Sequence, residues 1–184
     1  MTGMRVKTLT LLRHAKSGWD DPLTRDFDRP LNAKGRRAAA TVGRHLRDEG
    51  LAFDTVVASP ALRVQQTLVA VREGYGGDME PAWDRRLYLA SAGALLDVVR
   101  ELPDATARVL LVGHNPGLED LVLLLVPDAE AGLRDAVEEK YPTASVAELS
   151  LAVARWADAA EGGAALTRFV RPRDLDPSLG PDAD

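Results

Sequence analysis

The sequence of 184 residues contains no cysteine, which excludes disulfides, thiolate zinc sites and a cysteine nucleophile. It also lacks a polybasic block, and its net charge of −5 argues against a nucleic-acid-binding protein. No stretch approaches the roughly 18 apolar residues that a membrane span needs, and no apolar signal-peptide core precedes the first predicted strand. We therefore expect a cytoplasmic protein with neither a nucleic-acid nor a membrane partner.

With 46% hydrophobic and 28% charged residues, the chain has the composition of a soluble protein that can bury a core. No internal repeat and no linker divides it. We predict one domain over residues 1–175 and a flexible tail over 176–184, where proline and aspartate are frequent.

The first predicted strand, 8–12, is an apolar run that ends at Arg13 and His14. In open α/β sheets, ligands bind outside the carboxyl ends of the strands. An arginine and an imidazole at such an end therefore suggest a site for an anion. The alternative is that Arg13 and His14 are solvent-exposed residues at the start of a loop, which is more common for an Arg-His pair at a strand end.

The second predicted strand, 53–58, is followed by Ser59 as a helix N-cap and Pro60 at the first helical position. This places Arg63 in the first helical turn, where its charge meets the positive end of the helix dipole. A surface arginine would be unfavourable there, whereas an anion held between the two would remove the conflict.

A third strand, predicted over 107–112, ends near His114, and Asn115 and Pro116 are expected to start the next helix. Three strands thus deliver a polar or cationic group to a helix start, which favours a doubly wound α/β domain with one shared anion site. The other expected elements are a charged and partly helical segment over 127–140 and an antiparallel pair of edge strands over 145–153 and 165–170.

Two further helices are predicted from their end signals. One runs over 32–49, with Asn32 as its N-cap and Gly50 as its stop, and the other runs over 91–102, with Ser91 as its cap. We expect the polar loop over 19–30 to border the site and Tyr88 to cover the sheet.

These three motifs together resemble the histidine phosphatase superfamily, and within it the short SixA-like branch. The resemblance rests on residues 12–14, 59–67 and 112–115, in this order and spacing, and on the tail segment 171–175. It implies a three-layer α/β/α sandwich around a mostly parallel sheet, with the phosphoglycerate mutase-like fold. Only about fifty positions separate Arg63 from His114, so we expect no large helical lid.

The resemblance also implies roles for four residues. His14 would be the catalytic nucleophile that forms a phosphohistidine, while Arg13, Arg63 and His114 would hold the nonbridging phosphate oxygens. Ser17 is a further candidate for binding the phosphate. No metal ion or other cofactor is implied, because positioning and built-in cations meet most needs of phosphoryl transfer.

The sequence departs from the superfamily pattern at two positions. Ala15 follows the Arg-His pair, where many members have glycine. Leu89 occupies the position at which related phosphatases often carry the acid that protonates the leaving oxygen, so the acid is expected to be missing. Three aspartates are candidate substitutes for this acid: Asp20, Asp21 and Asp84.

We therefore predict a metal-independent phosphatase that acts on phosphohistidine in a phosphorylated protein. One alternative is the hydrolysis of a small phosphomonoester. Another is a noncatalytic module that binds phosphate and has lost turnover with the absent acid. The sequence does not indicate the oligomeric state.

Overall fold

A computed structural model describes residues 5–128 and 132–181. The strands are β1 (Lys7–Arg13), β2 (Thr55–Ala58), β3 (Pro81–Trp83), β4 (Arg108–Gly113), β5 (Val146–Leu151) and β6 (Ala164–Val170). The α-helices are α1 (Ala33–Asp48), α2 (Leu62–Tyr75), α3 (Ala92–Arg100), α4 (Gly117–Leu125), α5 (Leu133–Glu139) and α6 (Pro172–Leu175). Short 3-10 helices are η1 (Asp26–Asp28), η2 (Arg85–Leu87), η3 (Trp156–Asp158) and η4 (Pro177–Leu179).

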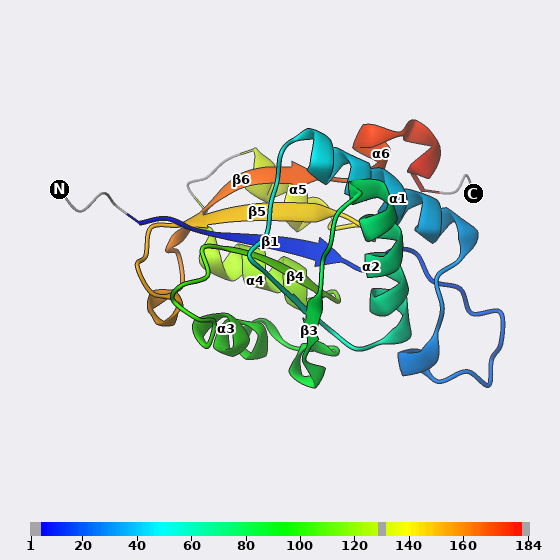
Figure 1. Cartoon of the computed structure of the whole chain (residues 1–184), viewed down its shortest axis with the longest axis horizontal. Helices are drawn as coiled ribbons and strands as arrows, with labels where there is room; N and C mark the ends of the chain where they lie inside the picture. The colour runs from blue at the N-terminus through cyan, green and yellow to red at the C-terminus, as the bar shows by residue number, and fades with distance from the viewer. Residues whose placement is uncertain (1–4, 129–131, 182–184) are drawn as a thin grey trace.

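The strands form one sheet in the order β3-β2-β4-β1-β5-β6 (Figure 1). The pairs β1–β4, β2–β4 and β2–β3 are parallel, whereas β5 is antiparallel to both β1 and β6. The mostly parallel sheet and the antiparallel pair at its edge are confirmed. The chain passes from β1 to β2 over β4, which lies between them. The helices that follow β1 and β4 therefore lie on opposite faces of the sheet, and ligands bind at the carboxyl ends of such neighbouring strands.

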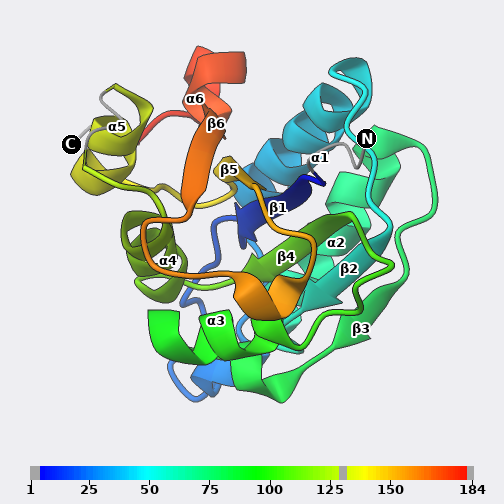
Figure 2. The ribbon, with the colours of Figure 1, turned by 90° about the vertical axis from the view of Figure 1, so that its left-hand side faces the viewer.

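Helices cover both faces of the sheet, which confirms the three-layer α/β/α fold (Figure 2). Alternate side chains of β1 enter opposite cores because side chains alternate along a strand. Leu9 and Leu11 pack in the core shared with α3, α4 and α5, while Leu12 packs in the core shared with α1 and α2. Each buried leucine contributes about 1.5–3 kcal/mol to folding.

Two helix starts agree with the sequence, and two differ. Asn32 caps α1 by accepting from the N–H of Gly35, and Ser91 caps α3 by accepting from that of Ala94. The predicted cap at Ser59 is wrong: the N-cap of α2 is Ala61, because Ser59 still pairs with β4 through its N–H.

The predicted cap at Asn115 is also wrong, since the N-cap of α4 is Pro116. The Asn115 side chain serves two other segments instead. Its Nδ2 donates to the Tyr141 carbonyl (3.1 Å), and its Oδ1 accepts from the N–H of Glu119 (3.3 Å). Asn115 therefore ties the start of α4 to the turn before β5.

The segment predicted as a flexible tail packs on the molecule over residues 176–181. It contains η4, whose apolar Leu179 packs against the core shared with α1 and α2. Lys34 in α1 also donates to the carbonyl of Gly180 (2.6 Å). Residues 182–184 lie outside the described part of the chain, and a single domain over 1–175 stays a prediction.

Between Arg63 and His114, the described chain contains the rest of α2, then β3, η2 and α3, and no large helical lid. Within residues 5–128 and 132–181, no helix combines the length and the apolar character needed to cross a membrane.

Candidate active site

Three neighbouring strands bring the candidate residues to one edge of the sheet. Arg13 in β1 pairs with Gly113 in β4, and Ala58 in β2 pairs with Val112. The residues that follow these strand ends therefore emerge side by side. The N–H of His14 continues the ladder by donating to the Gly113 carbonyl (3.1 Å).

His14 is buried, and a hydrogen bond at one of its ring nitrogens defines its tautomer. Its Nδ1 lies 2.7 Å from the carbonyl oxygen of Ala15, which can only accept, so Nδ1 carries the proton. The lone pair is then on Nε2. Burial lowers the pKa of His14 to about 3, and the hydrogen bond to Ala15 offsets part of a shift that Arg63, His114 and Arg13 increase. His14 is therefore neutral near pH 7, as a nucleophile must be.

Thr67 in α2 holds the peptide that orients His14. Its Oγ1 accepts from the N–H of Ala15 (2.9 Å) and donates to the carbonyl of Arg63 (2.6 Å). The side chain is fully buried. Thr67 was part of the motif that carried the resemblance, but the sequence did not suggest this positioning contact.

His114 lies directly beside His14, with 5.3 Å between the ring centroids. Its Nδ1 is 3.2 Å from Nη2 of Arg63, and its Nε2 is 2.7 Å from Oγ of Ser59. Because a guanidinium only donates, Nδ1 accepts and Nε2–H donates to Ser59. Burial and the Arg63 charge lower the pKa of His114 to about 4, so this ring is also neutral.

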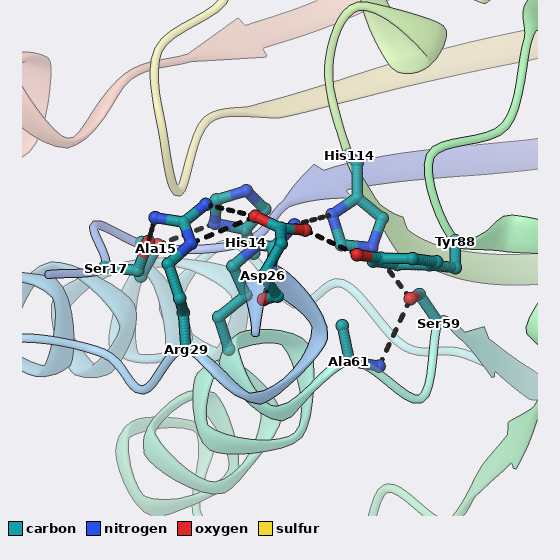
Figure 3. Close-up of polar contacts among 10 residues, drawn as sticks. His14, Ala15, Ser17, Asp26, Arg29, Ser59, Ala61, Tyr88 and His114 are labelled. Carbon is teal, nitrogen blue, oxygen red and sulfur yellow. Dashed lines mark hydrogen bonds and ion pairs between the residues drawn. The ribbon is translucent and has the colours of Figure 1, made fainter. Parts of the chain in front are cut away.

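Arg63 is 2% exposed and is held by Asp26 of η1. Its Nη1 donates to the Asp26 carbonyl (2.7 Å), and its Nη2 lies 3.1 Å from Asp26 Oδ2. The hydroxyl of Tyr88 donates to the same carboxylate oxygen (2.5 Å), as Figure 3 shows. Burial raises the pKa of Asp26, but Tyr88, Arg63 and Arg29 outweigh that effect and lower it to about 2.

Arg13 contributes charge to the same place from the end of β1. Its Nη1 donates to the carbonyl of Tyr141 (2.9 Å), and its charge lowers the pKa of both His14 and His114. The Nε atoms of Arg13 and Arg63 are buried without a hydrogen-bond acceptor in the described chain. Buried donors of this kind usually have a partner, so their presence beside His14 fits an anion site.

Ser17 lies at the side of this group. Its hydroxyl accepts from Nη1 of Arg29 (2.7 Å), and Nε of Arg29 donates to Asp26 (3.0 Å; Figure 3). Ser17 is thus connected to the site through Arg29 and Asp26. Its predicted contact with phosphate stays a prediction.

The three candidate substitutes for the acid are Asp20, Asp21 and Asp84. In the described chain, none of them forms a hydrogen bond with the residues around His14. Asp84 binds Arg86 and caps η2, Asp21 accepts from the N–H of Leu23 in an exposed turn, and Asp20 is exposed. Leu89 is 57% exposed, with a left-handed φ of 50°.

The sequence missed Asp26 and Tyr88. Asp26 lies in the loop between the first strand and the first helix, which was expected only to border the site, and no local pattern distinguishes it from its neighbours. Tyr88 was expected to cover the sheet, but its ring packs edge-on against His114 with 5.4 Å between the centroids. With a pKa of about 2, Asp26 is ionised near neutral pH and poorly suited to act as an acid.

The arrangement combines a neutral imidazole having a free Nε2 with two guanidinium groups and a second imidazole. Such a set can hold the three equatorial oxygens of a phosphoryl group while the nucleophile attacks phosphorus. Among the described residues, nowhere do three or more His, Asp or Glu side chains gather so that they could hold a metal ion.

Comparisons with known proteins agree with this geometry. The family described as histidine phosphatase superfamily (branch 1) matches residues 9–95. The uncharacterized protein Rv1276c of Mycobacterium tuberculosis is 36% identical over 164 residues, which are 88% of this chain and all of that protein.

Two solved structures extend the similarity to the fold. A SixA protein of Nakamurella multipartitia is 34% identical with a TM-score of 0.79, over 91% of this chain and 96% of its own. The protein histidine phosphatase SixA, solved in complex with tungstate, has a TM-score of 0.75 at 21% identity, over 92% of this chain and 99% of its own. This last similarity shows the fold alone.

Proposed function

This chain belongs to the histidine phosphatase superfamily, and on that premise we propose that it is a phosphatase that uses His14 as its nucleophile and acts on phosphohistidine in a protein. Membership of the superfamily itself supports an enzyme of the phosphatase or mutase type. The assignment of His14 as the nucleophile rests on one observation. The His14 ring donates from Nδ1 to Ala15, which leaves Nε2 free beside two arginines.

In the proposed reaction, the phosphate of the substrate lies among Arg13, Arg63 and His114. The lone pair of His14 Nε2 attacks phosphorus, and the bond from phosphorus to the leaving nitrogen breaks. That nitrogen takes up a proton from water. A water molecule then attacks the phosphohistidine and releases inorganic phosphate, which returns His14 to its neutral form. The two arginines stabilise the charge on the equatorial oxygens in both steps, so the mechanism uses no metal ion.

His114 has a specific requirement in this scheme. Its Nδ1 accepts from Arg63, so it can donate to a phosphate oxygen only after binding a proton at Nδ1. A phosphate dianion between Arg63 and His114 favours the protonated ring because the opposite charge raises its pKa.

The preference for phosphohistidine follows from the acids near the site. A general acid contributes about 10²- to 10⁴-fold when the leaving group is poor, as an alkoxide is. A leaving imidazole needs this help less, because its ring takes up a proton with an unperturbed pKa of about 6.5. Since Leu89 cannot donate a proton and Asp26 is ionised, we expect poor hydrolysis of alkyl phosphates. A small phosphomonoester remains the alternative substrate.

The test compares kcat/KM for a phosphohistidine peptide, an aryl phosphate and an alkyl phosphate, and traps labelled phosphate on the enzyme by rapid acid-free quenching. We expect the first two substrates to be cleaved far faster than the third, with the label on His14. His14→Ala should abolish turnover yet still bind inorganic phosphate. Equal rates for all three substrates would contradict the missing acid, and near-normal hydrolysis by His14→Ala would remove the covalent mechanism.

A further inference from the structure

A pocket of about 310 Å³ opens beside the candidate active site, on the side facing α6. It lies where the end of β1, the start of α1, the turn before β5 and the carboxyl-terminal segment meet, and Figure 1 shows α6 next to α1. The lining residues fall into a basic group and a mainly apolar group. The basic residues are Arg13, Lys16, Lys34, Lys140, Arg171 and Arg173. The others are mostly apolar and include Ala38, Pro142, Pro172, Leu179 and Pro181.

The charge of this pocket is opposite to that of the whole protein. Among the described residues that line it, six are Lys or Arg and none is Asp or Glu, although the chain has 28 acidic and 23 basic residues. Arg171 pairs with Asp174. Lys140 and Arg173, in contrast, form no ion pair with any carboxylate of the described chain. Cations gathered on a concave surface focus a positive field, which attracts an anion in spite of the negative net charge.

Arg13 connects the pocket to the catalytic centre. It lines the pocket, and its charge acts on both His14 and His114. Lys16, another lining residue, follows His14 by two positions. A group bound in the pocket is therefore next to the phosphate in the active site, so both can belong to one substrate.

The distribution of the cations favours an extended substrate. They come from four separate parts of the chain, from β1 to α6, rather than from one loop as in a compact phosphate cradle. The apolar residues between them suit a carboxylate carried on a short aliphatic stem. A volume of about 310 Å³ is at the small end for ligand pockets, which matches one or two side chains.

We propose that this basic pocket binds acidic side chains of the protein substrate, Asp or Glu lying close to the phosphohistidine. The inference deepens the proposed function and rests on it. Acidic neighbours of the phosphohistidine then determine which proteins this enzyme dephosphorylates, while the catalytic residues recognise the phosphate itself.

The test uses two phosphohistidine peptides that differ only in Asp and Glu neighbours replaced by Asn and Gln. We expect the natural protein to favour the acidic peptide by about 5- to 10-fold in kcat/KM, and this preference to shrink as salt is added. In the double variant Lys140→Gln/Arg173→Gln the preference should disappear, while hydrolysis of the amide peptide and of an aryl phosphate stays unchanged.

A control with the same loss of charge is Arg72→Gln/Arg155→Gln. Arg155 is exposed and Arg72 is half-buried, and both lie outside the pocket lining, so the preference should persist. No preference in the natural protein, or a preference that survives Lys140→Gln/Arg173→Gln, would overturn the proposal. A higher kcat/KM for small bisphosphates than for monophosphates, with no such increase for acidic peptides, would overturn the assignment to a protein substrate.

The failure of the proposed function can be recognised separately. If the natural protein hydrolyses neither aryl phosphate nor phosphohistidine, the phosphatase assignment fails. Titration calorimetry with the unphosphorylated acidic peptide then examines the pocket alone. Binding that Lys140→Gln/Arg173→Gln weakens would support the pocket, and equal binding by both proteins would refute it.

Discussion

Arg63 and Asp26 form the polar contact on which the candidate site most depends. The guanidinium is buried, and a buried charge is costly unless it is paired and hydrogen-bonded. Asp26 supplies both a carboxylate and a carbonyl to it. The same carboxylate also repels an incoming phosphate dianion. Asp26 therefore stabilises the folded protein and opposes ligand binding, and one substitution can separate the two effects.

We expect Asp26→Asn to bind inorganic phosphate about 3- to 10-fold more tightly, because a like charge is removed while the carbonyl still holds Arg63. The free energy of unfolding should fall by about 1–2 kcal/mol, a modest loss because the carboxylate is partly exposed. Calorimetric titration and urea unfolding measure the two changes. Asp28→Asn, which removes an exposed carboxylate of the same η1 helix, should change neither. Weaker phosphate binding by Asp26→Asn would show that the carboxylate is needed to aim Arg63.

At the scale of elements, α2 supplies Arg63 and also fixes the segment after β1. The two helices α1 and α2 pack with very close backbones, since a Cβ on Gly43 would lie 2.2 Å from the carbonyl oxygen of Val71. This contact sets the position of α2 against the sheet. Thr67 then transmits that position to Ala15, and Ala15 to the ring of His14.

Thr67→Val keeps the shape of the side chain but removes both hydrogen bonds. We expect a loss of about 1–3 kcal/mol in the free energy of unfolding, because the buried N–H of Ala15 is left without a partner. Activity should fall about tenfold or more in kcat, with a smaller change in KM, since His14 is aimed less well. Thr67→Ser keeps the hydroxyl and should restore most of kcat. If Thr67→Val lowers stability but leaves kcat intact, Thr67 does not position His14.

At the scale of the whole molecule, burial of two neutral histidines makes folding depend on pH. The pKa of His14 is lowered to about 3 and that of His114 to about 4, against 6.5 in the unfolded chain. Between these values the unfolded chain binds more protons than the folded one. The contribution of the two neutral rings to the free energy of unfolding is therefore fully present above about pH 6.5, and it is lost as the pH falls from there toward the pKa values of the folded protein.

Each histidine should contribute a loss of about 2 kcal/mol between pH 7.5 and pH 5, so the total is roughly 3–4 kcal/mol. Guanidinium unfolding at both pH values, followed by tryptophan fluorescence, measures it. The double variant His14→Gln/His114→Gln should lose most of this dependence, since glutamine does not titrate. Asp26 does not enter the comparison, because its contribution is lost only below its unperturbed pKa of 3.8. An unchanged stability at pH 5 would mean that the two rings are not held neutral.

Most of the strands and helices could be predicted from the sequence because their signals are local, but β3 could not, since its three residues carry no periodic pattern. The apolar run of β1, the cap at Asn32 and the stop at Gly50 act through neighbouring residues, and each was found where predicted. The positions of Arg13, His14, Arg63 and His114 also followed, since each stands at a strand end or in the first turn of a helix. Parallel strands in one sheet bring such positions together whatever the details of the loops.

The partners of these residues, in contrast, could be found only from the folded structure. Asp26 meets Arg63 across 37 positions of sequence and Tyr88 across 62, and Ser59 meets His114 across 55. These contacts depend on the path of loops that have no periodic pattern. Ser59 and Asn115 show the same limit. Both residue types favour helix caps, but distant partners hold Ser59 against β4 and His114, and Asn115 against Tyr141. The basic pocket is a further example. Its cations come from distant parts of the chain and become neighbours only when α6 packs beside α1 and β1.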